Sequence, residues 1–224
     1  MQHLFLCCSA NESITVYACD CSSEALEWAK EMINAADGIS AKNLFHPFQC
    51  DFSRSGVPKW LACDTCRQIF SHTQHACISD INKNRRRDLN DLTFSKETSC
   101  CIGGVDFVTL IFTLSAIPLL EMPAAIAECF FVLKPGGLLL FRDYGLYDMT
   151  MLRFEQEQRV GFREYMRSDG TRSYFFCLDS VRNLFIGAGF TELELEYCCV
   201  KSVNRRNGKS MRRVWVHGKF QKPM

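Results

Sequence analysis

The sequence lacks the segments that would place the protein in or across a membrane. Its first residues, 1–8, have no basic region and only a short apolar stretch, so they do not follow the pattern of a secretory signal. The longest apolar run, 105–120, is broken by Asp106, Thr109, Thr113 and Ser115 and is not expected to span a bilayer. Net charge is also nearly absent, at +1 over 224 residues. We therefore expect no membrane partner.

Cysteine, by contrast, is abundant, with 14 residues. Several of these cysteines lie inside apolar runs, where a reduced thiol packs as a small hydrophobic group. They are Cys19, Cys50, Cys129, Cys177 and Cys198. Because no secretory pattern accompanies them, we expect reduced thiols and a location in the cytoplasm or nucleus.

The small net charge hides an uneven distribution. Residues 1–141 hold 11 Lys and Arg against 15 Asp and Glu, whereas residues 142–224 hold 15 against 10. A basic C-terminal third suits a polyanionic partner, although ordinary solvated charge explains the same excess equally well.

The order of apolar and amphipathic segments predicts an α/β fold in a single domain, 1–224. Strands are expected at 14–19, 44–50, 105–112 and 138–141, with helices at 22–32 and 118–133. Pro135, Gly136 and Gly137 form a turn before the last of these strands. Strands that alternate with helices are typical of a parallel, doubly wound sheet. Residues 1–10 carry little pattern and suggest at most a short helix.

The polar stretch 59–104 interrupts this alternation and is expected to be an inserted surface loop. It contains a Cys63-x2-Cys66 pair, one usual half of a tetrahedral zinc site. The other half would come from an irregular set, namely His72, His75, Cys77, Cys100 and Cys101. We favour a plain insertion without a metal, and keep a zinc-stabilised interaction module as the alternative.

Charged side chains follow three of the predicted strands. Asp20 follows strand 14–19, Asp51 follows strand 44–50, and Arg142-Asp143-Tyr144 follows strand 138–141. The carboxyl ends of parallel strands form the edge where ligands bind, and an acidic residue there can accept hydrogen bonds from ribose hydroxyls. Simpler interpretations stay open: Asp20 as a helix cap, Asp51 as a turn residue, and Asp143 as a strand-end cap.

Aromatic and arginine residues are interleaved after Gly145. The pattern predicts a hairpin of 163–166 with 172–176, a helix at 179–189, and a closing hairpin of 192–203 with 212–220. Aromatic rings beside arginines suit stacking on unpaired bases and contacts with phosphate. Core packing is the alternative, and we prefer it for Phe176. The candidates for RNA binding are Tyr147, Arg153, Arg167, Arg172, Tyr174, Arg205 and Arg206.

Several of these segments resemble the tRNA N3-methylcytidine methyltransferases of the methyltransferase-like group. The general matches are Tyr17-Ala18-Cys19-Asp20-Cys21-Ser22, Phe48-Gln49-Cys50-Asp51, residues 110–116 and Leu133-Lys134-Pro135-Gly136-Gly137. The more specific ones are residues 141–148 and 169–176. The resemblance covers about 14–58 and 105–222 and does not extend into the insertion.

The resemblance implies a Rossmann-like fold that binds S-adenosylmethionine and methylates a cytidine in a tRNA anticodon loop. By position, Asp20 would hold the ribose hydroxyls, and Asp51, with Phe52 beside it, would accept from the adenine amine. Ile111 would pack against the cofactor. An anticodon-loop base is already unpaired and costs little to splay out. An accessory protein, such as an aminoacyl-tRNA synthetase, is a further expected partner.

The chemistry of this reaction needs positioning more than a base. N3 of neutral cytosine carries a lone pair and no proton, so the enzyme must align it with the sulfonium methyl group and stabilise the growing positive charge. A carboxylate that accepts a hydrogen bond from the N4 amine would both position the base and stabilise this charge. We expect Asp143 in this role, with Tyr144 or Tyr147 stacking on the base and Arg142 ordering the carboxylate or a phosphate.

The sequence departs from the family at its start. Such enzymes open with a strand and a glycine-rich turn that lets the cofactor approach the backbone, whereas all 13 glycines here lie at Gly38 or later. We expect the fold to miss its first strand and this loop, as in an N-terminally truncated chain. The sheet would then have a gap and cofactor binding would be weak or absent. A non-catalytic form that binds RNA or a partner is therefore the alternative function.

Overall fold

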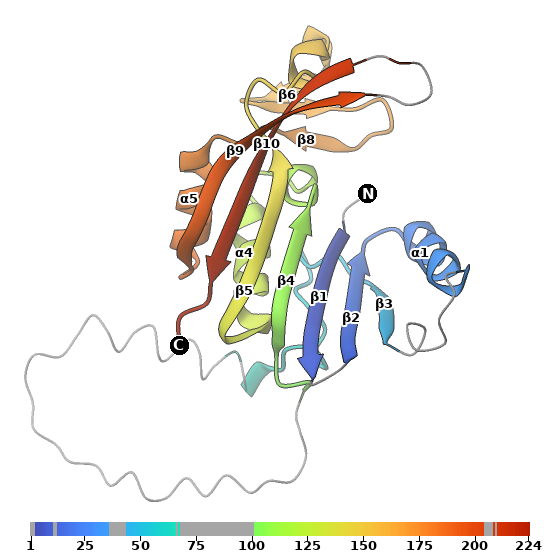
Figure 1. Ribbon diagram of the computed structural model, residues 1–224, viewed down its shortest axis with the longest axis vertical. Helices are drawn as coiled ribbons and strands as arrows, with labels where there is room; N and C mark the ends of the chain where they lie inside the picture. The colour runs from blue at the N-terminus through green and yellow to red at the C-terminus, as the bar shows by residue number, and fades with distance from the viewer. Residues whose placement is uncertain are drawn as a thin grey trace, which may run out of the picture.

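The computed structural model describes residues 3–10, 13–35, 44–65, 67, 101–203, 208 and 210–224. Its main sheet has seven strands in the order β3-β2-β1-β4-β5-β10-β9, seen face-on in Figure 1. The strands are β1 (His3–Ala10), β2 (Ser13–Asp20), β3 (Phe45–Gln49), β4 (Val105–Ile111), β5 (Leu133–Tyr144), β9 (Thr191–Val203) and β10 (Ser210–Gln221). Each strand that the sequence predicts for this sheet overlaps one of these strands, although the predicted 44–50 and 105–112 are slightly longer than β3 and β4.

The centre of the sheet differs from the prediction. The sequence suggested at most a short helix at its start and a missing first strand, but residues 3–10 form β1 and fill the position between β2 and β4. β1 runs antiparallel to both neighbours, with Leu4 opposite Cys19 and Leu110. The predicted gap in the sheet is therefore wrong. An unpaired edge on β2 and β4 leaves backbone groups without partners, and β1 supplies them.

The sheet is mixed rather than wholly parallel. β2 pairs with β3, and β4 with β5, in parallel, whereas the closing hairpin of β9 and β10 is antiparallel, as predicted. Behind the sheet in Figure 1 lie α4 (Met122–Val132) and α5 (Leu178–Gly187), and α1 (Ser23–Ala35) packs beside β2 and β3. α4 begins four residues later than predicted, because Pro118 is followed by a turn.

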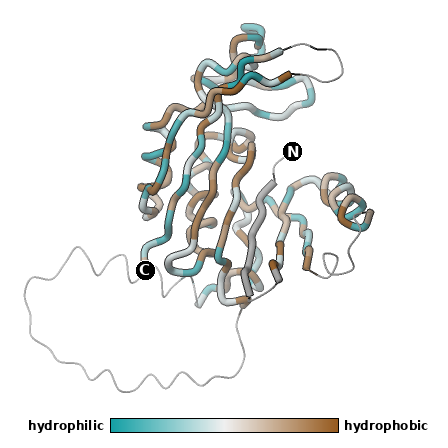
Figure 2. The backbone as a smooth tube through the Cα atoms, in the orientation of Figure 1, coloured by the Kyte–Doolittle hydropathy of each residue, from teal (hydrophilic) through white to brown (hydrophobic). Residues whose placement is uncertain are grey.

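The core lies between the sheet and the two helices behind it. Large side chains that are fully buried there include Leu110, Leu139, Ile126, Phe185 and Phe220. The rings of Phe185 and Phe220 stack at 4.1 Å between centroids, which ties α5 to β10. In Figure 2 the apolar, brown segments concentrate in the middle strands, and hydrophilic segments dominate residues 159–174. This pattern matches strands that are covered on at least one face.

A second, three-stranded sheet lies over the carboxyl ends of β4 and β5 (Figure 1). It consists of β6 (Arg159–Gly161), β7 (Glu164–Met166) and β8 (Arg172–Tyr174), and two short 3-10 helices, η2 (Met151–Arg153) and η3 (Gln156–Gln158), precede it. β7 and β8 form the predicted hairpin, whose turn contains Gly170 at a φ of 79°. β8 packs against the 3-10 helix η1 (Leu114–Ala116), so the small sheet contacts the loop that follows β4.

The Pro-Gly-Gly segment forms the start of β5 rather than a turn outside it. Gly136 has a φ of 77°, a conformation that glycine tolerates far better than other residues. At Gly137 a Cβ atom would lie 2.9 Å from the carbonyl oxygen of Lys134 and 3.1 Å from that of Asp106. Both glycines are therefore required by the backbone path into the strand.

The predicted surface insertion is shorter at its start than expected. Leu61, Ala62 and Cys63 are buried in the core, and Arg67 forms an ion pair with Glu128 of α4. Most of the insertion, including Cys66, His72, His75, Cys77 and Cys100, lies outside the described residues. Within the described part, no group of three or more His, Cys, Asp or Glu side chains is arranged to hold a metal ion.

None of the helices in the described part of the chain has the length and apolar character needed to cross a bilayer.

Candidate functional site

Asp20 ends β2 and is one of the residues that line a cleft at the carboxyl edge of the sheet. Its side chain is buried, and Oδ1 accepts a hydrogen bond from the backbone amide of Ser22 at 2.7 Å. Ser22 in turn caps α1, because its hydroxyl accepts from the amide of Ala25 at 3.2 Å. The cap of α1 is therefore Ser22 rather than Asp20, and Asp20 holds the turn before the helix through the Ser22 amide.

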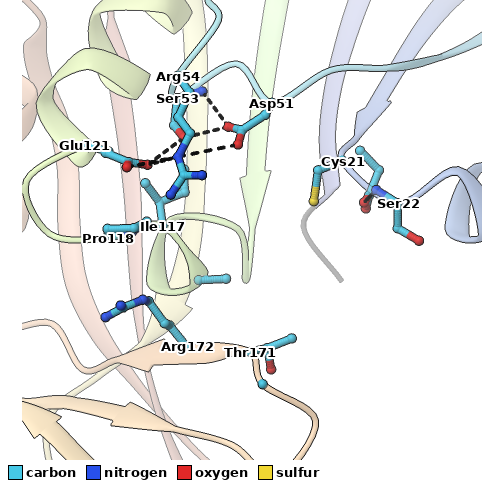
Figure 3. A pocket seen from close by; sticks show the side chains of 13 residues that line it. Cys21, Ser22, Asp51, Ser53, Arg54, Ile117, Pro118, Glu121, Thr171 and Arg172 are labelled. Atoms are coloured by element: carbon cyan, nitrogen blue, oxygen red, sulfur yellow. Dashed lines mark hydrogen bonds and ion pairs between the residues drawn. The ribbon is translucent and has the colours of Figure 1, made fainter.

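Asp51 lies on the neighbouring side of the same cleft, directly after β3. Its Oδ1 accepts from the hydroxyl of Ser53 at 2.7 Å, and Arg54 stands 3.9 Å from Oδ2. Arg54 also donates to Glu121, the residue before α4, at 3.0 Å. This chain of polar contacts fixes the turn after β3 to the start of α4 and keeps the Asp51 carboxylate at the cleft wall (Figure 3).

The cleft has a volume of about 440 Å³, within the range of small-molecule sites. Its two walls come from distant parts of the chain. The carboxylates of β2 and β3 lie on one side, and Gly170, Thr171 and Arg172 of the small sheet form the opposite rim (Figure 3). Between them lie Ala116, Ile117 and Pro118, which follow β4. Arg172 is held by an ion pair with Glu164 on the adjacent strand.

Two carboxylates at adjacent strand ends fit the nucleoside part of S-adenosylmethionine. Carboxylates in such positions can accept hydrogen bonds from the hydroxyl and amine groups of a nucleoside. No glycine turn is present for the methionine part of the cofactor, because residues 1–37 contain no glycine. β1 also runs in the reverse direction, so its His3 end, rather than its carboxyl end, lies beside the carboxyl end of β4. The described residues thus match one half of the cofactor.

Phe52 and Ile111, two further predicted cofactor contacts, do not line this cleft. Phe52 is buried in the core cluster. Ile111, the last residue of β4, lines a separate hollow on the open face of the sheet, together with Arg142 and His217. The apolar cleft wall is supplied by Ile117 instead.

Asp143 is buried completely, on the helix-facing side of β5. One carboxylate oxygen accepts from the amide of Ser115 at 2.9 Å, and the other from the amide of Tyr144 at 2.8 Å. Burial raises the pKa of this carboxyl to about 6, and these hydrogen bonds oppose that rise. Contact with a substrate base requires the segment at Ser115 to move; the predicted role of Asp143 stays a prediction.

Arg142 and Tyr144 point to the other face of β5, because side chains alternate along a strand. Arg142 therefore does not order the Asp143 carboxylate. It donates to Nε2 of His217 at 2.8 Å and lies 5.0 Å above the ring of Trp215. The ring of Tyr144 contacts that of Phe112 at 4.9 Å. Arginine and aromatic side chains thus form a half-buried cluster at the carboxyl ends of β4 and β5 and on the neighbouring part of β10.

The candidates for RNA binding have different surroundings. Tyr147 is 73% exposed and Arg153 is exposed as well. Arg167 lies 5.4 Å from the Tyr144 ring and donates to the Ser173 hydroxyl at 2.6 Å. Tyr174 is buried and packs edge-on against Phe176, as core packing would predict. Arg205 and Arg206 lie outside the described residues.

Several residues of the site had no clear signal in the sequence. Arg54 and Glu121 are 67 positions apart, and only the fold brings them together at the cleft. Phe112 has a φ of 52°, rare for a bulky residue, and its amide donates to the carbonyl of Arg142 at 2.8 Å. A sequence pattern does not reveal such a backbone conformation. His217 and Trp215 lie in an ordinary strand pattern.

The profile of the methyltransferase domain family matches residues 8–195 of this chain. The chain belongs to that family. As a methyltransferase domain it also has curated relatives. It is 46% identical over 119 residues to the mouse (Mus musculus) tRNA N(3)-cytidine methyltransferase METTL6, covering 53% of this chain and 42% of that protein. It is 43% identical over 119 residues to the tRNA N(3)-methylcytidine methyltransferase Mettl2 of Drosophila melanogaster, covering 53% and 37%.

A third relative carries a different name. O-methyltransferase 3 of Dictyostelium discoideum is 46% identical over 124 residues, covering 54% of this methyltransferase domain and 28% of that protein. The chain therefore spans less than half the length of the curated relatives it matches.

Solved structures share the fold. A SAM-dependent methyltransferase from Methanosarcina mazei matches 92% of this chain and 81% of its own, with a TM-score of 0.53 and 14% identity. Another, from Anabaena variabilis, matches 91% and 66%, with a TM-score of 0.52 and 14% identity. At such identities the likeness concerns the α/β methyltransferase fold alone.

Proposed function

We propose that this methyltransferase domain uses S-adenosylmethionine to form 3-methylcytidine in the anticodon loop of a tRNA. The observation that carries the proposal is the cleft in which Asp20 and Asp51, at adjacent strand ends, face the arginine-bearing rim of the small sheet. The carboxylates suit the hydroxyl and amine groups of a nucleoside cofactor, and the arginine-bearing rim suits a polyanionic substrate. The relatives named for tRNA N(3)-cytidine methylation support the choice of substrate.

The roles divide along the cleft. Asp20 holds the ribose hydroxyls and Asp51 the adenine amine, and the cofactor supplies the methyl group. Arg172, at the opposite rim, contacts an RNA phosphate, and the exposed Tyr147 stacks on an unpaired base. Since N3 of cytosine needs no deprotonation, these residues bind and orient rather than move a proton. Recognition of a particular tRNA with an accessory protein, and a cytoplasmic location, are part of the same proposal.

Calorimetry with S-adenosylhomocysteine and nucleoside mass spectrometry of tRNA anticodon-loop transcripts test the proposal. We expect 3-methylcytidine in the presence of S-adenosylmethionine, and its loss together with cofactor binding in Asp20→Ala. Asp64→Ala is the matched control, because Asp64 is exposed, forms an ion pair with Lys59 and does not line the cleft. If the protein binds the cofactor but forms 3-methylcytidine in none of the transcripts, the proposed substrate is wrong. Absence of cofactor binding would contradict the reaction.

A non-catalytic RNA-binding or partner-binding form is the second candidate. The reverse direction of β1 and the absence of glycine before Gly38 favour it, since both remove the usual support for the methionine part of the cofactor. This form predicts RNA binding that is unchanged in Asp20→Ala and insensitive to S-adenosylhomocysteine. Electrophoretic shift of an anticodon-loop RNA, with and without S-adenosylhomocysteine, separates the two candidates.

A further inference from the structure

Two cysteines lie directly beside the two cleft carboxylates. Cys19 precedes Asp20 at the end of β2, and Cys50 precedes Asp51 just after β3. The parallel pairing of these strands places Asp20 opposite Gln49, and the amide of Cys50 donates to the carbonyl of Asp20 at 3.1 Å. The thiols therefore belong to the backbone segments that position the carboxylates.

The two cysteine side chains lie close together. The sulfur of Cys19 donates to the carbonyl oxygen of Cys50 at 3.3 Å, and the sulfur of Cys50 donates to the carbonyl oxygen of Gly56 at 3.2 Å. The neighbouring Cys19 thiol lowers the pKa of Cys50 to about 7, with a further contribution from Ser55 and against the effect of burial, whereas the Cys50 thiol and burial raise the pKa of Cys19. Cys50 is half-buried and Cys19 is buried. Cys50 is thus the reachable nucleophile and Cys19 the thiol behind it.

The present backbone does not suit a disulfide. Cys19 pairs with Phe48, and Cys50 lies two residues further along. With about 4.8 Å between strands and about 3.3 Å per residue, the Cα atoms of Cys19 and Cys50 are roughly 8 Å apart. Disulfides span about 4.4–6.8 Å between Cα atoms. Bond formation must therefore draw the Cys50 backbone along the strand direction toward Cys19, strain its hydrogen bond to Asp20, and displace Asp51.

We propose that Cys19 and Cys50 are a peroxide-sensitive thiol pair whose disulfide displaces Asp51 and weakens binding at the cleft. The Cys50 thiolate attacks one oxygen of hydrogen peroxide and the O–O bond breaks. Hydroxide leaves and takes up a proton as water, and Cys50 becomes a sulfenic acid. The Cys19 thiol then attacks the Cys50 sulfur, the S–O bond breaks, and a second water leaves. The two sulfurs lose two electrons, which the peroxide gains, and a dithiol reduces the disulfide again.

The oxidation itself is tested without cofactor. The full chain is treated with hydrogen peroxide, alkylated and mapped by mass spectrometry, and its backbone amide exchange is followed. We expect a Cys19–Cys50 disulfide and faster exchange across 50–55, both reversed by dithiothreitol. In Cys19→Ala, Cys50 should instead accumulate as a sulfenic acid that dimedone traps. Cys50→Ala should form no disulfide at Cys19.

The matched control is Cys177→Ser. Cys177 is also half-buried, and despite burial its pKa is lowered by hydrogen bonds from Ser180 and Arg163, but it lies at the start of α5, away from the cleft. This variant should behave like the unchanged protein. A disulfide of Cys50 with Cys21, which faces the cleft, or unchanged exchange in 50–55 after oxidation, would overturn the proposal.

The consequence for the cofactor rests on the proposed function and is measured separately. S-adenosylhomocysteine binding should weaken at least tenfold on oxidation and recover on reduction, and should not change in oxidised Cys50→Ala. Equal affinity before and after formation of the mapped disulfide would overturn the coupling to the cleft. Failure of the reduced protein to bind would instead contradict the proposed function, and the exchange result would still decide the displacement of Asp51.

Discussion

The carboxylate of Asp143 accepts a hydrogen bond from the backbone amide of Ser115 at 2.9 Å, which joins the end of β5 to the segment after β4. The next residues along that segment, Ala116 and Ile117, line the cleft. Asp143 thereby positions one cleft wall from inside the protein, whatever it contacts during a reaction.

The stability of the protein should depend on pH through Asp143. Because burial raises its folded-state pKa to about 6, above the usual value of 3.8, the folded state holds more protons than the unfolded state between these values. The advantage of the unchanged protein over Asp143→Asn should therefore grow as pH falls from 7 to 4, on the order of 1–3 kcal/mol. Urea denaturation of both proteins at several pH values measures it. An advantage that shrinks toward low pH would show that the carboxyl is charged in the folded state.

Asp148 should be far more sensitive to substitution than an exposed acidic residue. It is fully buried and accepts hydrogen bonds at 2.8 Å from Arg213, from the amide of Val214 and from the amide of Thr150. Asp148→Ala leaves Arg213 and two amides without their acceptor and should lower the free energy of unfolding by about 3–5 kcal/mol. The matched variant Asp64→Ala removes a fully exposed ion pair with Lys59 and should leave the free energy of unfolding nearly unchanged. Similar losses in the two variants would refute this contrast.

Two Gly→Ala substitutions should change the stability of the protein in opposite directions. At Gly137 the new methyl group meets two carbonyl oxygens, and the variant should lose about 1–3 kcal/mol of stability. At Gly187, in the last turn of α5, the new methyl group meets nothing within 4 Å, and alanine favours the helix by about 0.5–1 kcal/mol. Thermal denaturation followed by circular dichroism compares the two. A stabilised Gly137→Ala would show that the path into β5 is less constrained than its geometry indicates.

Lys222 should anchor the C-terminal residues to α4. Its buried ammonium donates to the carbonyl of Phe130 at 2.8 Å and to that of Leu133 at 2.7 Å, at the end of the helix where cations are favoured. Lys222→Met leaves both carbonyls without this donor and should cost about 1–3 kcal/mol. Lys134→Met, which removes a partly exposed ion pair with Asp106, is the control and should cost less than about 1 kcal/mol. Equal unfolding midpoints for the two variants in urea would argue against the anchor.

The strands, the helices and the strand-end positions of the two cleft carboxylates can be predicted from the sequence because they depend on local patterns. The apolar run at 105–112, the Ser22 cap and the turn at Gly170 each act over a few residues. Whether a particular side chain faces the core or a ligand site is harder to predict. The sequence suggests a cofactor contact for Phe52 and an RNA contact for Tyr174, yet both are buried, because an aromatic residue next to a polar one suits a core as well as a site.

The amino-acid pattern is enough to predict the α/β fold and the position of Asp20 and Asp51 at strand ends. The strand at residues 3–10 follows instead from the fold, because its partners in β2 and β4 are set by pairing over long distances and not by its own weak pattern. The fold also decides that Arg142 and Asp143, adjacent in sequence, lie on opposite faces of β5 with different partners. The physical reason is the same in both cases: which face is buried depends on what packs against it.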